Sequence, residues 1–279
     1  MTPPDEVPGG AFSIGRKRGM RNLRLCLDVF EGIPEETLYP AMRAAGFDGF
    51  FTPPDIAHDL HALRRVKRFA EGLGLFQETV HSSIGNCWSI WHEGPEGDAY
   101  TELLLRNVDH CAAIGVPVLV VHPQTNLLPG AEVRLGLPRL QRVVAYASER
   151  GVRIAIENVD SDELLTACME TFREPHVGFC YDSGHECWLT PDAHYLRRYG
   201  DRLLCLHLND NDKTWDKHFL PGDGKADWEG IIAELRAAEF RGPVTLEVAY
   251  KGDYPARYTP EAYVQRCYEI ASEIAEKLA

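Results

Sequence analysis

Short apolar runs of strand length alternate with longer segments of helical period along the chain from residue 23 onward. Several of these runs are apolar at consecutive positions, which is typical of strands buried on both faces in a parallel sheet. Strands that alternate with helices predict repeated βα units. Eight runs occur, at residues 23–29, 48–52, 75–81, 117–122, 153–157, 177–181, 203–207 and 244–247. The pattern therefore predicts an α/β chain folded as a single (β/α)8 TIM barrel with parallel strands.

The segments between these runs carry apolar residues at helical spacing, as Leu104, Val108 and Cys111 do. Such stripes are expected to face the sheet. In two places, at 190–191 and 259–260, a threonine precedes a proline, a pair typical of a helix N-cap followed by a first-turn proline. We therefore expect helices to begin at these two points.

Residues 1–20 are rich in proline, glycine and charge, and we expect them to form a flexible leader. The catalytic barrel is expected to span residues 21–279, because barrels of this kind commonly reach that length. No apolar stretch approaches the ~20 residues needed to cross a bilayer, so no membrane partner is expected. Eight cysteines occur without a CxxC pair, which predicts buried, reduced thiols in a cytoplasmic protein.

The charge balance limits the class of partner. A formal net charge of −13 provides no basic footprint for gripping a phosphate backbone, so nucleic-acid binding is disfavoured. A small-molecule substrate is the expected partner. The sequence does not determine the oligomeric state, and both a monomer and a homo-oligomer are compatible with it.

Most of the apolar runs are followed by side chains that can bind a metal ion. Five runs end on such a residue and a sixth is followed by one directly, namely His81, His122, Glu157, Asp182, His207 and Glu247. The carboxyl ends of barrel strands converge on one face, so these residues are expected to meet there. A carboxylate buried at a strand end needs a partner or a cation. Any one of these residues alone is typical of a solvated or paired group, but together they predict a divalent-metal centre.

The ligand types indicate which ions suit this centre. Glutamate, aspartate and histidine favour Zn, Mn, Co or Mg, and the lack of clustered cysteine argues against a thiolate site. With Glu157, Asp182, His207 and Glu247 around one ion, a substrate could fill the open positions. His185, Asp216 and His218 form a second candidate cluster. They could hold another metal, or Asp216 and His218 could orient each other or bind substrate hydroxyls.

Five segments carry a resemblance to a known family: 154–158 (IAIEN), 181–185 (YDSGH), 207–212 (HLNDND), 218–224 (HFLPGDG) and 246–247 (LE). In order and spacing they resemble the xylose isomerase-like barrel superfamily. This superfamily includes sugar phosphate isomerases and epimerases and the AP endonucleases of the endonuclease IV class. The similarity covers nearly the whole chain after residue 23, and it distinguishes weakly between the branches.

Resemblance to the ketose epimerase branch implies one metal held by Glu157, Asp182, His207 and Glu247. The two glutamates would also be the catalytic proton acceptor and donor, and His185 would contact substrate. The metal would chelate a hydroxy-carbonyl sugar and acidify its neighbouring C–H, which the carboxylates would then move. The arginine that follows the seventh-strand histidine in that branch is not evident here. Lys213 stands near its place as a candidate substrate-binding residue.

Resemblance to the endonuclease branch implies three zinc ions held by nine residues. Each has a counterpart of the right type, which adds five possible metal ligands to the four above: His81, His122, His185, Asp216 and His218. The first strand, however, reads LCLDV at 25–29 and lacks the Gly-Ala-His-Val-Ser signature of those enzymes. Uncharacterised sugar isomerase-like proteins also carry the Asn-Asp loop with Asp-x-His. We therefore favour a metal-dependent sugar isomerase or epimerase over a zinc phosphoesterase, with hydrolase and lyase chemistry left open.

Four tryptophans follow predicted strand ends, Trp88, Trp91, Trp188 and Trp215. They could stack against the apolar faces of a sugar substrate, although most aromatic side chains are core. A non-catalytic metal- or sugar-binding barrel is the remaining alternative. The presence of both Glu157 and Glu247 favours an enzyme, because a catalytic metal needs a nearby proton carrier.

Overall fold

The computed structural model describes residues 23–123 and 129–279. Its strands form one parallel sheet in the order β7-β6-β5-β4-β3-β2-β1-β8. The strands are β1 (Leu25–Glu31), β2 (Gly49–Thr52), β3 (Phe76–His81), β4 (Val118–Val121), β5 (Arg153–Glu157), β6 (Val177–Asp182), β7 (Leu203–His207) and β8 (Val244–Ala249). The amide of Leu208 donates to Thr245 O (2.9 Å) and that of Glu247 donates to Leu208 O (3.1 Å), which joins the two edges. The predicted barrel is confirmed, and every predicted run overlaps its strand.

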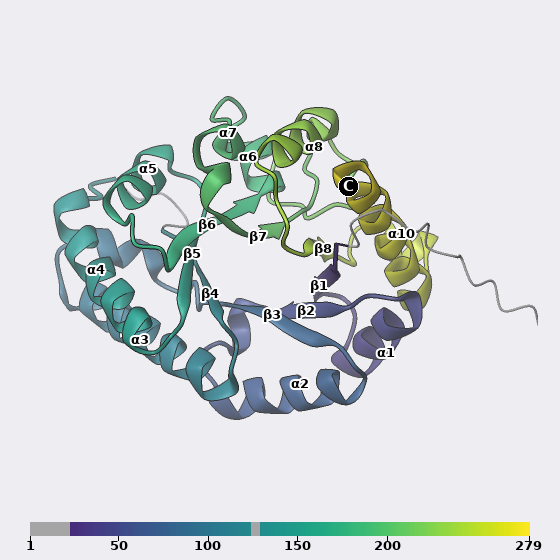
Figure 1. The fold of residues 1–279 in the computed structure, drawn as a ribbon, viewed down its shortest axis with the longest axis horizontal. Coiled ribbons are helices and arrows are strands. Elements are labelled where there is room, and N and C mark those ends of the chain that lie inside the picture. The colour runs from purple at the N-terminus through teal and green to yellow at the C-terminus, as the bar shows by residue number, and fades with distance from the viewer. Residues whose placement is uncertain (1–22, 124–128) are drawn as a thin grey trace, which may run out of the picture.

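Helices surround the ring of strands (Figure 1). The α-helices are α1 (Glu35–Ala45), α2 (Leu60–Gly72), α3 (Pro95–Ile114), α4 (Val133–Glu149), α5 (Asp162–Thr171), α6 (Ser183–Leu189), α7 (Tyr195–Tyr199), α8 (Trp228–Ala237), α9 (Tyr254–Arg257) and α10 (Pro260–Leu278). Short 3-10 turns are η1 (Pro54–Ile56), η2 (Cys87–Trp91) and η3 (Gly200–Arg202). Within 23–123 and 129–279, no helix is long and apolar enough to cross a bilayer. The predicted leader, 1–20, lies outside the described residues.

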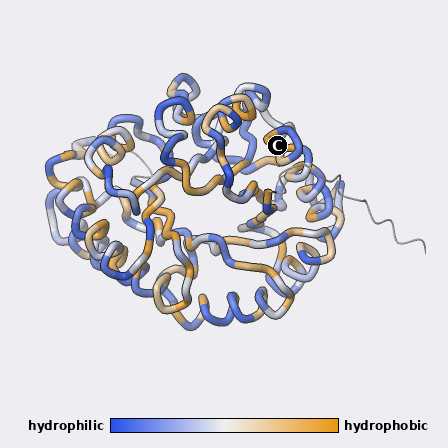
Figure 2. The backbone as a smooth tube through the Cα atoms, viewed as in Figure 1, coloured by the Kyte–Doolittle hydropathy of each residue, from blue (hydrophilic) through white to orange (hydrophobic). Residues whose placement is uncertain are grey.

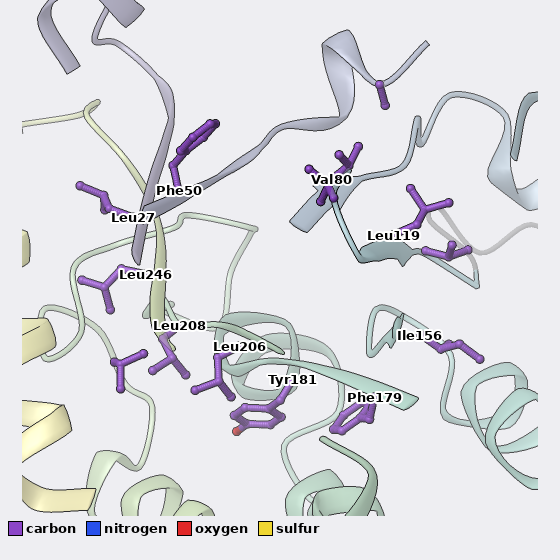
Figure 3. Close-up of a cluster of buried hydrophobic side chains, with 14 of the residues drawn as sticks. Leu27, Phe50, Val80, Leu119, Ile156, Phe179, Tyr181, Leu206, Leu208 and Leu246 are labelled. Atoms are coloured by element: carbon purple, nitrogen blue, oxygen red, sulfur yellow. The ribbon is translucent and has the colours of Figure 1, made fainter. Parts of the chain in front are cut away.

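The main apolar core lies between the outer faces of the strands and the helices. The strands run orange along much of their length in Figure 2, while the helices alternate orange and blue, as expected when only one helix face is buried. Figure 3 shows side chains such as Leu27, Ile156 and Leu246 pointing away from the centre of the ring. The predicted stripe of Leu104 and Val108 on α3 is fully buried on this side. All eight cysteines are buried, as expected.

One of the two predicted helix starts is confirmed. Thr259 caps α10, and its hydroxyl accepts a hydrogen bond from the amide of Ala262 (3.3 Å). The prediction at Thr190 is wrong, because Thr190 ends α6 instead of starting a helix. The helix after β6 begins at once, since the Asp182 carboxylate accepts from the amide of His185 (2.6 Å) and supplies the N-cap itself.

The inner face of the barrel changes character along its axis. Side chains alternate between faces in a strand, so Arg153, Ala155 and Glu157 share the inner face of β5. The middle layer is apolar and consists of Val118, Val120, Ala155, Cys180 and Cys205. Acidic and imidazole groups lie on the C-terminal side of this layer, and arginines lie at the N-terminal mouth.

Glu78 is a buried carboxyl group on the N-terminal side of that layer. Burial raises its pKa to about 7, although the hydroxyl of Thr245 donates to it (2.6 Å). Because the pKa in the folded chain exceeds the ordinary value of 4.5, the protonated group favours folding below pH 4.5 and this contribution is lost as the pH rises through 7. A shift of this size corresponds to about 3 kcal/mol.

We therefore expect Glu78→Gln to raise the free energy of unfolding by up to about 3 kcal/mol at pH 8 and to change it little at pH 4.5. The amide keeps an oxygen for Thr245 but carries no charge at either pH. Urea unfolding of both proteins at the two pH values measures the difference. A difference of equal size at both pH values would contradict the assignment.

Candidate metal centre

Glu157 lies at the centre of the polar cluster and is fully buried at the end of β5. Its Oε2 lies 3.3 Å from Nε2 of His81 and 3.2 Å from Nε2 of His122. Its Oε1 lies 3.2 Å from Nδ1 of His207 and 3.5 Å from Nδ1 of His185. Neither oxygen has a hydrogen-bond partner among the described residues. One carboxylate thus faces two separate groups of donor atoms.

The first group consists of His81, His122 and Glu157, whose ligand atoms lie within 4.8 Å of one another. Nδ1 of His81 is 2.8 Å from the carbonyl of Ser82. A carbonyl can only accept, so Nδ1 carries the proton and Nε2 presents a lone pair. This Nε2 lies 3.0 Å from Nε2 of His122. A proton or a cation must lie between these nitrogens, and Oε2 of Glu157 faces the same point.

The second group brings together the four predicted primary ligands, Glu157, Asp182, His207 and Glu247, with their ligand atoms within 4.8 Å of one another. Nδ1 of His207 is 3.4 Å from Oε2 of Glu247. Neither ring nitrogen of His207 forms a hydrogen bond with the described residues. Cys180 lies near Glu157 and His207 too, but burial raises the pKa of its thiol, which disfavours the thiolate that binds metals.

The third group consists of His185, Asp216 and His218. Nδ1 of His185 donates to the carbonyl of Asn158 (3.0 Å), and Nδ1 of His218 donates to the carbonyl of Glu247 (3.1 Å). The Nε2 atoms of the two rings lie 3.4 and 3.1 Å from Oδ2 of Asp216. Backbone carbonyls therefore orient both rings, as they do for metal-bound histidines.

Neighbouring side chains hold these groups in place. The amide nitrogen of Asn209 donates to Oδ2 of Asp182 (2.9 Å), and Asn158 bonds the backbone of Asp182 through both ends of its side chain (2.8 Å each). Phe51 stacks on the imidazole of His207 with ring centroids 4.5 Å apart. The cluster is thus supported by rigid strand ends, which is what a preorganised site requires.

The surroundings of the two glutamates, Glu157 and Glu247, shift their pKa values in opposite directions. Burial opposes ionisation of Glu157, but the imidazoles of His207 and His122 outweigh it and hold the pKa of Glu157 well below its usual range. Burial and the negative charges of Glu157 and Asp182 raise the pKa of Glu247 well above its ordinary value. Burial lowers the pKa of His122 to about 4, although the carboxylate of Glu157 opposes this shift. Two carboxyl groups with opposite shifts are typical of an acid/base pair.

The predicted aromatic contacts divide into core and surface residues. Trp91 is fully buried and its indole N–H donates to Pro123 O (2.5 Å), so its predicted role in a substrate pocket is wrong. Trp188 and Trp215 pack together with centroids 5.4 Å apart, and Trp215 is exposed beside Asp216. Trp88 lies against His92. Lys213 is an exposed residue of the loop that leads to Asp216. Substrate contact by Trp88, Trp188, Trp215 and Lys213 stays a prediction.

Two acidic residues near the cluster were missed by the strand-end pattern. Asp28 lies on β1 in register with Glu247, and burial raises its pKa to about 8. Asp210 holds the loop that carries Asp216, because its carboxylate accepts from the amides of Gly222 (2.8 Å) and Ala226 (2.9 Å). Asp28 stands inside an apolar run, whereas Glu157 ends one, so the strand-end pattern did not include Asp28.

The residues present fit a divalent cation. The oxygens of Glu157 and the nitrogens of His207, which have no hydrogen-bond partner in the part of the chain that the structure describes, converge with further carboxylates in a buried space. Leaving several such groups buried without a counter-charge is costly, whereas a bound cation would satisfy them together. Oxygen and imidazole donors suit Zn, Mn, Co or Mg.

The protein is a parallel (β/α)8 barrel whose strand ends converge on a cluster of Glu, Asp and His residues that could hold a metal ion. The profile of the Xylose isomerase-like TIM barrel family matches residues 40–267, and the chain belongs to this family. This confirms the resemblance seen in the sequence.

Relatives of known sequence come from several branches. The uncharacterized protein y4fM of Sinorhizobium fredii is 28% identical over 85% of this chain and 88% of that protein. The 3-dehydroshikimate dehydratase of Pseudomonas putida is 25% identical over 76% of this chain, which spans only 35% of the dehydratase. A probable endonuclease 4 of Mesoplasma florum is 23% identical over 57% of this chain and 62% of that protein.

Solved structures show the same fold. A crystal structure of the IolI protein with a bound zinc atom has a TM-score of 0.73 at 16% identity and covers 92% of this chain and 99% of that chain. The 3-keto-D-glucoside 4-epimerase of E. coli has a TM-score of 0.68 at 20% identity and covers 91% of this chain and 99% of that chain. The proteins that resemble this chain thus bear the names of a sugar epimerase, a dehydratase and an endonuclease.

Proposed function

We propose that this chain is a metal-dependent isomerase or epimerase that acts on a ketose-type sugar. The observation that carries the proposal is the four-residue group of Glu157, Asp182, His207 and Glu247, which places two buried glutamates in one donor set. A divalent ion bound there would polarise the carbonyl and the adjacent hydroxyl of a sugar. A small carbohydrate is therefore the proposed partner.

In this proposal the chain's own residues move one proton. One glutamate takes the proton from the carbon beside the carbonyl and the other returns a proton to the substrate, either on the opposite face or at the neighbouring carbon. His185 would orient substrate hydroxyls through Nε2, because Nδ1 is held by Asn158 O. Trp188 and Trp215 would cover the apolar sugar face at the rim.

Solvent-isotope exchange tests the proposed reaction. The metal-loaded chain is incubated with D-fructose, D-tagatose and D-psicose in deuterated water and followed by NMR. We expect deuterium to enter beside the carbonyl, together with formation of an isomer or epimer. Absence of exchange on every ketose, with metal bound, would reject the proposed reaction for these substrates.

A second candidate function is multinuclear phosphoester hydrolysis. It is favoured by the first and third donor groups, which lie beside the four-residue group. Glu157 faces the first group through Oε2 and the four-residue group through Oε1, so its carboxylate could bridge two ions. Adjacent divalent ions could stabilise the attacking and leaving oxygens of a phosphoester. Cleavage of DNA containing an abasic site tests this function directly.

Metal content of His218→Ala distinguishes the two candidates. If the third group holds an ion, we expect the variant to lose about one metal equivalent per chain, because Asp216 and His185 alone leave an incomplete site. Elemental analysis of both proteins after dialysis measures this. Unchanged stoichiometry would show that His218 is a substrate-contacting or supporting residue and would favour the single-metal isomerase.

A further inference from the structure

A cavity of about 530 Å³ opens at the N-terminal ends of the strands, the opposite end of the barrel from Glu157. This volume is within the range of small-molecule sites. The lining comes from the starts of β3, β4, β5 and β7 and from the residues just before β1 and β8, and it includes Arg24, Gln77, Glu78, Thr79, Arg153 and Pro243. None of these residues belongs to the candidate metal centre.

An apolar layer separates this cavity from the metal centre. Val118 lines the cavity and packs with Val120, Ala155, Cys180 and Cys205 across the barrel interior. Arg153 and Glu157 stand at opposite ends of β5, about 13 Å apart along the strand. A ligand in the cavity would therefore not touch Glu157.

Three consecutive residues of β3 present unsatisfied polar atoms beside this cavity. Oε1 of Gln77, Oε1 of Glu78 and Oγ1 of Thr79 have no hydrogen-bond partner among the described residues, although the side chains are only 6%, 9% and 1% exposed. Buried polar atoms are normally paired, so three neighbouring exceptions need an explanation. The register of β3 against β2 shifts at this point, since Phe50 pairs with Gln77 while Thr52 pairs with Val80. Such bulges are common beside binding sites.

Two arginines stand at the mouth of the cavity. Arg24 and Arg153 lie two residues before Cys26 and Ala155, so strand alternation places them on the inner face. Both are exposed, and neither has an ion-pair partner in the described residues. The guanidinium of Arg24 lies 4.4 Å from the ring centroid of Phe76. Of the other charged lining residues, Arg241 and Glu239 face each other at 3.7 Å, and Asp201 lies nearby.

We propose that this N-terminal cavity binds a small polyhydroxylated anion. Its anionic group contacts Arg24 and Arg153, and its hydroxyls donate to Oε1 of Gln77 and Oε1 of Glu78, which lack a partner within residues 23–123 and 129–279. The arginine fork suits a carboxylate or a phosphate, and the deeper acceptors select a ligand that also carries hydroxyl donors. Burial disfavours the charged form of the Glu78 carboxyl group and so costs stability, and binding a ligand is a physical reason for a carboxyl group at this position.

Calorimetric titration of the full chain tests this site. The probes are D-gluconate and D-glucose 6-phosphate, which present a carboxylate and a phosphate, with sorbitol and inorganic phosphate as the hydroxyl-only and anion-only probes. We expect at least one sugar anion to bind with a dissociation constant of about 1 mM or tighter, and sorbitol not to bind. The sugar anion that binds more tightly identifies whether the site prefers a carboxylate or a phosphate. Failure of both sugar anions to bind would overturn the proposal.

Matched double variants locate the binding. Arg24→Gln/Arg153→Gln is expected to weaken the sugar anion at least tenfold, while Arg64→Gln/Arg68→Gln, with the same change of charge on exposed positions of α2, leaves it unchanged. Equal affinity in both variants would place the ligand elsewhere, such as the metal centre, and reject the site. Inorganic phosphate binding as tightly as the sugar anions would reject the assigned roles of Gln77 and Glu78. Because the metal centre is intact in both variants, these outcomes are independent of the proposed isomerase activity.

Discussion

Glu247→Gln is expected to leave the barrel folded and its metal bound while lowering kcat for ketose proton exchange by about a thousandfold or more. The amide has nearly the same shape as the carboxyl group and retains one oxygen toward His207, which lies 3.4 Å from Glu247. It cannot take up or release the proton in the reaction. The measurement is the rate of deuterium incorporation into the ketose that the wild-type chain converts, with metal content determined on the same sample.

Glu31→Gln is the matched control for this prediction. Glu31 also lies at a strand end, on β1, but it is exposed and paired with Lys251 at 3.2 Å. An exposed ion pair contributes little to stability, so this variant should keep full activity. Full activity in Glu247→Gln would refute its role as acid or base. Loss of activity together with loss of metal would show that the main role of Glu247 is to bind the metal and not to transfer the proton.

The sequence predicted the barrel and the primary cluster for the same physical reason. Apolar runs define the strands, and a parallel barrel brings all their carboxyl ends to one face. Glu157, His207 and Glu247 could therefore be grouped from their positions alone. Asp28 was not predicted to join the cluster because its acidic side chain stands within an apolar run and not at the end of one. Strand alternation nevertheless places Asp28 on the inner face with Cys26.

Other features depend on contacts between distant residues and could not be placed from local pattern. The approach of Asp216 to His185 depends on a loop held by Asp210, which bonds Gly222 and Ala226 across that loop. Thr190 carried a capping pattern, but Asp182 had already started the helix. The bulge in β3 that gathers Gln77 and Glu78 has no distinct signal in the sequence.

Removal of divalent metal is expected to lower the Tm by about 10 °C. A ligand that binds only the folded chain, present at a thousand times its Kd, stabilises it by about 4 kcal/mol, and each kcal/mol shifts the Tm of a chain of this size by roughly 2–4 °C. The physical reason is that Glu157, Asp182 and Glu247 share one buried space, where their negative charges repel unless a cation lies among them. Thermal unfolding followed by circular dichroism, before and after chelation and after readdition of Zn or Mn, measures the shift.

His207→Ala separates metal loss from other effects of the chelator. The imidazole is buried and both of its nitrogens lack hydrogen bonds to described residues, so its main contribution in this interpretation is to the ion. The variant should have a lower Tm than the wild-type chain and should respond little to chelation, because its metal affinity is already reduced. A wild-type Tm that does not change on chelation, with metal removal verified, would mean that protons and not a cation neutralise Glu247 and Asp182. The raised pKa values of these two groups would then describe the working state of the site, and metal-dependent isomerisation would be rejected.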